Sequence, residues 1–160
     1  MTKRKTDHSK DMASGSFGAE VVFRCPDIRK EVFSGKMHEL MMGVAKRVEA
    51  ERGALLGHAK MFVETGGGFL KLSVVDTTLG VEAIHELKAD TISEGKIRIM
   101  AVAIGMKDGV IEEIVKDEVS RLSPVVLCDI QEHDHICDHH HEHGHECKCA
   151  RRRRGPGPAS

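Results

Sequence analysis

The chain contains no Trp and no Tyr, and only five of its 160 residues are Phe. A hydrophobic core must therefore be built from aliphatic side chains and Met, which suffice for a domain of about 100 residues. Scarce aromatic residues leave few platforms on which nucleic-acid bases could stack. The net charge of −1 adds no general attraction to nucleic acids or anionic membranes. We therefore expect neither as a partner.

The chain also lacks long apolar runs. No segment approaches the roughly 18 to 20 apolar residues that a membrane helix needs, and the N-terminal part lacks the apolar centre of a secretory signal. Four of the five cysteines, Cys128, Cys137, Cys147 and Cys149, crowd together beside histidines instead of spreading along the chain as a disulfide framework would. These features indicate a cytoplasmic protein with reduced thiols.

Composition divides the chain into four parts. Residues 1–18 are polar and basic, and we expect them to be disordered. Residues 19–123 carry the pattern of one globular domain. Residues 124–150 are rich in His and Cys, and residues 151–160 form a basic, disordered end that includes four consecutive arginines, from Arg151 to Arg154.

Two segments of the globular domain have a helical periodicity. A first helix, from an N-cap at Ser34 to a stop near Gly53, presents one apolar face made of Met37, Leu40, Met41, Val44, Ala45 and Val48. A last helix begins with Asp108 as its N-cap, ends before Pro124, and directs toward the core Ile111, Ile114, Val115, Val119 and Leu122.

Strands are expected between the two helices. Segments 56–64 and 69–76 alternate apolar and polar residues around a turn of three glycines, and further strands fit 81–87 and 96–106, with a short one near 20–24. The end of segment 96–106 is apolar on both faces, which indicates a central strand or one covered by another subunit. The fold class is α+β: a two-layer sandwich with a mainly antiparallel sheet of about four strands and two flanking helices, followed by a disordered His/Cys-rich tail.

The His/Cys-rich segment carries eleven donors suited to transition metals. They are Cys128, His133, His135, Cys137, His139, His140, His141, His143, His145, Cys147 and Cys149. Imidazole and thiolate suit nickel and zinc, and six acidic residues between them lower the cost of cation approach. At about four donors per ion, the ceiling is two to three ions. The spacing matches no standard zinc finger, so the segment predicts exchangeable nickel or zinc sites.

The segment from His133 to Cys149 resembles the His-rich extensions of nickel metallochaperones and storage proteins that serve urease, hydrogenase and carbon monoxide dehydrogenase. The resemblance implies that the segment holds nickel for insertion into an enzyme, and it does not extend to the globular domain. Residues 34–37 contain a Gly-Lys pair but lack the upstream glycine and the following Ser or Thr of a P-loop. The chain therefore departs from the nickel GTPases of those pathways.

Other candidates in the domain are weaker. His58, His85 and Cys25 could form an internal metal site, although single histidines on strands are more often surface residues. The glutamates have the spacing of exposed faces, and no Ser nucleophile elbow, HExxH or dinucleotide fingerprint is present. The sequence therefore offers no positive indication of enzymatic activity.

These observations lead to one principal hypothesis, a metal-binding accessory protein that stores or delivers nickel or zinc to a client metalloenzyme. Its partners would be that client or a maturation protein, with the globular domain serving for docking or as a homodimer. Two alternatives remain open. One is a metal-responsive regulator that binds DNA or protein through the arginine block, and the other is an enzyme of unknown reaction with a metal-reservoir tail.

Overall fold

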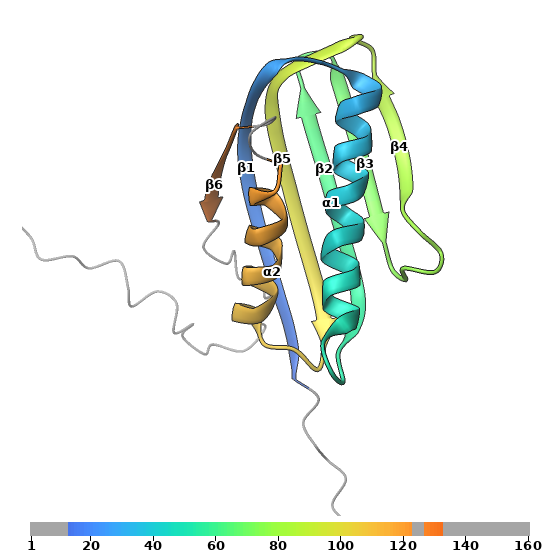
Figure 1. The fold of residues 1–160 in the computed structure, drawn as a ribbon, viewed down its shortest axis with the longest axis vertical. Coiled ribbons are helices and arrows are strands. Elements are labelled where there is room, and N and C mark those ends of the chain that lie inside the picture. The colour runs from blue at the N-terminus through green and yellow to red at the C-terminus, as the bar shows by residue number, and fades with distance from the viewer. Residues whose placement is uncertain (1–12, 123–126, 133–160) are drawn as a thin grey trace, which may run out of the picture.

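The computed structural model describes residues 13–122 and 127–132. Eight elements follow one another: β1 (Ser14–Arg29), α1 (Lys30–Ala50), β2 (Leu55–Thr65), β3 (Gly68–Val74), β4 (Glu82–Leu87), β5 (Thr91–Ile104), α2 (Asp108–Ser120) and β6 (Leu127–Glu132). The six strands form one sheet in the order β4-β3-β2-β5-β1-β6, and every neighbouring pair is antiparallel. Both helices lie on the same face of the sheet (Figure 1). The expected α+β two-layer sandwich is confirmed, with six strands in place of about four.

The core lies between the helices and the face of the sheet that they cover. All six residues of the predicted apolar stripe of α1 are buried. The helix begins at Lys30, one turn before the expected N-cap Ser34, and its first turn contributes the fully buried Phe33. The Phe33 ring stacks on that of Phe23 in β1, with 5.1 Å between the ring centroids. This aromatic contact packs the first turn of α1, which was not predicted, against the sheet.

Strands β2 and β3 form the hairpin that the glycine turn predicts. Thr65 pairs with Gly68 at the closed end of the hairpin. Gly68 has a φ of 127°, a backbone conformation that residues other than glycine rarely adopt. Strand β5 lies between β2 and β1, so it is central, as its apolar sequence indicates. Its residues on the helix-covered face, which include Ile97 and Ile99, are buried, whereas Met100 on the opposite face is 41% exposed.

Strand β1 begins within the segment 1–18, which the sequence predicts to be disordered. At Gly15 the strand passes so close to the chain entering α2 that an added Cβ would overlap the carbonyl oxygen of Met106. The N–H of Ser16 donates a hydrogen bond to the Asp108 carboxylate at 2.8 Å. Gly15, which belongs to the segment predicted to be disordered, is therefore the residue that permits this close approach.

Helix α2 differs from expectation at its start. Asp108 is its first helical residue and Lys107 is the N-cap, with no side-chain capping bond. The helix ends at Ser120, and the expected terminator Pro124 lies outside the described residues. The five predicted core residues of this helix region are all buried. Neither helix of the described region is long and apolar enough to cross a membrane.

Strand β6 lies in the segment 124–150, which the sequence assigns to the metal-binding tail. Its backbone pairs with the outer edge of β1 from Arg24 opposite Leu127 to Ala19 opposite Glu132. The first part of the predicted tail is therefore a strand at the edge of the sheet, and the boundary of the ordered fold extends at least to Glu132.

Candidate functional site

Ten of the eleven predicted metal ligands lie outside the described residues. They are His133, His135, Cys137, His139, His140, His141, His143, His145, Cys147 and Cys149. Cys128 alone lies within a described element, in β6, where its Cα is the partner of Phe23 in β1. The metal-binding prediction therefore rests on the sequence, and the structure adds the place at which the ligand-rich segment joins the fold.

The two strand histidines lie on opposite faces of the sheet. His58 of β2 is paired with Val102 of β5 on the face without helices, and its Nε2 is buried with no hydrogen-bond partner. His85 of β4 is exposed and is paired with Leu70, which is buried beneath the helices. The sheet therefore separates the two imidazoles.

Cys25 of β1 makes contacts that involve neither histidine. Its thiol donates a hydrogen bond to the carbonyl oxygen of Ile92 at 3.4 Å and packs against the hydrophobic core. Burial, followed by the negative charge of Asp27, raises the pKa of the Cys25 thiol. Within residues 13–122, no three His, Cys, Asp or Glu side chains are grouped so that they could hold a metal ion. The structure thus does not assemble the internal site suggested for Cys25 and the two histidines.

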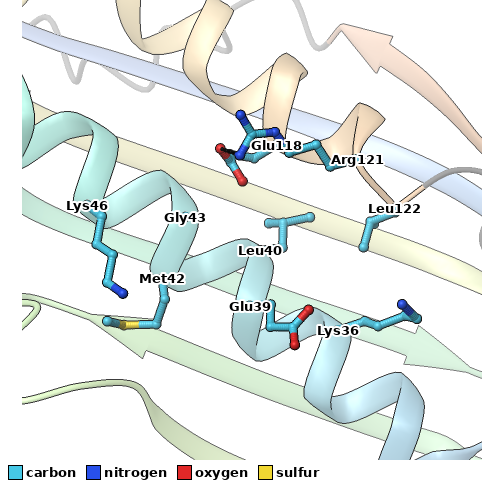
Figure 2. Close-up of a pocket in the computed structure, with 9 residues that line it drawn as sticks. All are labelled: Lys36, Glu39, Leu40, Met42, Gly43, Lys46, Glu118, Arg121 and Leu122. Carbon is cyan, nitrogen blue, oxygen red and sulfur yellow. Dashed lines mark ion pairs between the residues drawn. The ribbon is translucent and has the colours of Figure 1, made fainter.

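The described region instead contains a groove between α1 and α2, with a volume of about 360 Å³. Its lining combines basic, acidic and apolar side chains: Lys36, Glu39, Leu40, Met42, Gly43, Lys46, Glu118, Arg121 and Leu122. Figure 2 shows the carboxylate of Glu118 beside the guanidinium of Arg121, above the stretch of α1 that carries Gly43. Charged side chains of α2 thus lie beside α1 at this groove.

Glu118 is the buried charge at this helix junction, with only 5% of its surface exposed. Its Oε1 accepts one hydrogen bond from Arg47 of α1 at 3.4 Å and lies 3.0 Å from a guanidinium nitrogen of Arg121. Gly43 of α1 leaves the space that the second carboxylate oxygen occupies, because an added Cβ would overlap it. Since all of these partners belong to the protein itself, the arrangement is explained by helix docking without a ligand.

Sequence reasoning did not single out Glu118, although a signal was present. The residue falls between Val115 and Val119 on the apolar stripe of α2, where an acidic side chain faces the neighbouring helix. A buried acidic residue within an apolar stripe requires a partner that pairs with its charge. The partner itself, Arg47, is 71 residues away and cannot be identified from spacing.

The helix-free face carries a second ionic network. Glu20 of β1 is 9% exposed, and its carboxylate accepts hydrogen bonds from Lys96 and from Arg98 of β5, each at 3.2 Å. Arg98 also lies 3.6 Å from Glu64 of β2. The network joins three strands across the sheet and leaves exposed charges of both signs on this face.

None of the family models, curated proteins or solved structures compared with the chain matches it. The function is therefore inferred from the chemistry of this chain's own residues.

Proposed function

We propose that the protein is a metal-binding accessory protein that stores or delivers nickel or zinc to a client metalloenzyme in the cytoplasm. One observation carries this proposal: the segment from Cys128 to Cys149 contains four Cys and seven His. Such a density of imidazole and thiolate groups has no explanation in core packing, whereas it matches the donor preferences of borderline metal ions.

The order of the ligands supports exchangeable binding. A histidine stands at every second position in two stretches, at His133 and His135 and then from His139 to His145, with His140 as an additional donor. A short stretch can therefore offer several imidazoles to one ion. The pair Cys147 and Cys149 adds two thiolates separated by a single residue. Because these ligands bind metal only when deprotonated, occupancy is expected to fall as the pH decreases through the histidine range near 6.5.

The remainder of the chain would act as the carrier of this segment. Strand β6 joins the segment to the edge of the sheet beside β1, so that the ligands begin at a fixed place on the domain. The domain would then serve for docking onto the client metalloenzyme or a maturation protein.

The test compares the full chain with a variant that ends at Glu132, which keeps β6 and loses the ten ligands that follow it. Both reduced proteins are dialysed against nickel or zinc, and the bound metal is measured by elemental analysis. We expect about two to three ions in the full chain and at most one in the shorter variant. Circular dichroism checks that the shorter chain keeps its fold. Equal metal content in two folded proteins would disprove the proposal.

A further inference from the structure

The face of the sheet opposite the helices exposes large apolar side chains. Within residues 13–122, six large hydrophobic residues are exposed, and three of them, Leu55, Ile84 and Met100, lie in strands on this face. They come from β2, β4 and β5, so they are distributed across the sheet. One solvated face is common for antiparallel sheets, but such a face is normally polar.

An uncharged strip runs along the centre of this face. In β5, the side chains of Met100, Val102 and Ile104 lie on the helix-free face, because they alternate with the buried residues of the same strand. In β1, the paired residues are all small: Gly18 opposite Met100, Ser16 opposite Val102, and Ser14 opposite Ile104. The small residues of β1 leave the apolar side chains of β5 uncovered on that side, and the strip can be approached closely by another flat surface.

The charges around the strip balance one another. Among residues 13–122, five cationic residues on this face are matched by five acidic ones: Arg24, Lys60, Lys71, Lys96 and Arg98, and Glu20, Glu64, Glu82, Glu86 and Glu94. A nucleic acid or a strongly acidic protein would meet no excess of positive charge here. A surface that carries both signs in equal number beside an apolar strip is instead complementary to a rotated copy of itself.

The size of the face also suits a second copy. The five strands from β4 to β1 in the sheet order, at about 4.8 Å spacing, and about six residues of each, at about 3.4 Å rise per residue, cover roughly 24 Å by 20 Å. Side chains make the accessible area larger than this projection, which brings it near the roughly 800 Å² per partner of a stable interface.

We propose that the helix-free face is the interface of a homodimer, in which two sheets pack against each other across a two-fold axis near Met100 and Val102. The sheets would lie about 10 Å apart with their strands crossing at about −30°. The dimer then has four layers, with the helices of each copy outermost. This assembly does not depend on the metal-binding segment, and it stands or falls separately from the proposed function.

The test measures the mass of the full chain by sedimentation equilibrium, with a thiol reductant and a chelator present so that neither disulfides nor bound metal can link the chains. We expect a dimer. Met100→Glu should weaken it by roughly 100-fold or more in dissociation constant, because the two-fold axis brings both new carboxylates into one apolar interface. Val32→Glu is the matched control, since Val32 is 47% exposed on α1, and it should remain dimeric.

Gly18→Arg provides a second variant that the monomer should tolerate. An added Cβ at Gly18 meets no atom closer than the Ile99 carbonyl oxygen at 3.7 Å, so the arginine extends outward into the space that the second copy would occupy. It should also produce monomers. A wild-type monomer under these conditions would overturn the proposal, as would dimers of both face variants that are as stable as those of the Val32→Glu control.

Discussion

The junction between α1 and α2 allows a prediction in which one substitution changes the sign of its effect. Replacing Gly by Ala inside a helix normally stabilises it by about 1 kcal/mol. At Gly43 the new methyl group would overlap the carboxylate of Glu118, which must then move away. Gly43→Ala should therefore be destabilising in the wild-type chain and stabilising once Glu118 is removed.

The magnitude follows from the bonds that Glu118 would lose. Hydrogen bonds to charged groups contribute about 1.5 to 3 kcal/mol each, but Arg47 and Arg121 are 34% and 67% exposed, so that water replaces part of the lost interaction. About 1 kcal/mol for each bond is then appropriate. The loss of about 2 kcal/mol exceeds the helical gain, and Gly43→Ala should lower the free energy of unfolding by about 1 kcal/mol.

A double-mutant cycle with Glu118→Ala measures this coupling by urea unfolding. In the Glu118→Ala background, Gly43→Ala should raise the free energy of unfolding by about 1 kcal/mol, giving a coupling energy of about 2 kcal/mol. Gly35→Ala is the control on the same helix, because an added Cβ there meets no atom within 4 Å, and it should stabilise both backgrounds. Equal stabilisation by Gly43→Ala in both backgrounds would refute the proposed steric relation.

Three further predictions concern single positions. Hydrogen bonds from Thr78 lower the pKa of Asp76, so its contribution to stability is present above the pKa of this carboxyl in the unfolded chain and is lost as the pH falls through its lower pKa in the folded chain. Asp76→Asn should therefore destabilise the chain at neutral pH and match the wild type at the acidic end of a urea-unfolding series. Gly95→Ala should lower the free energy of unfolding by about 1 to 3 kcal/mol, because the added Cβ overlaps the backbone carbonyl of Glu64; unchanged denaturation curves would contradict this. Since burial and then a nearby carboxylate raise the pKa of Cys25, iodoacetamide should modify it more slowly than it modifies free cysteine, as mass spectrometry of the labelled peptide can measure.

The sequence predicts those parts of the fold in which a local period reflects burial. The apolar stripe of α1 and the alternation of Ala59, Met61 and Val63 in β2 both mark residues that are buried in the structure. A helix that docks on a sheet repeats its inward face about every 3.6 residues and a strand every two, so each pattern can be recognised without knowledge of the partner. The antiparallel hairpin follows for the same reason, because its turn lies next to its strands in the sequence.

The first and last described strands could not be predicted in this way. Strand β1 starts in a segment rich in Ser and Gly, and it is held by pairing with β5, about 90 residues further along the chain. Strand β6 is short and precedes a segment of polar composition, and among the described strands it neighbours β1 alone. For both strands the decisive hydrogen bonds are long-range, whereas local composition favours disorder.

The pairing of β6 changes how the metal ligands can be grouped. From Cys128 to Glu132 the backbone is extended along β1, and four residues at about 3.4 Å per residue separate these two positions by about 14 Å. Donors on one zinc ion lie only about 2.0 to 2.3 Å from the metal, so Cys128 and His133 cannot share an ion unless the following chain returns along the strand. Without Cys128, the ten donors that follow Glu132 still suffice for two ions at about four donors each. The variant that ends at Glu132 isolates Cys128 on an intact sheet edge, and any ion that it retains reports on the strand, whereas the difference from the full chain reports on the ten ligands.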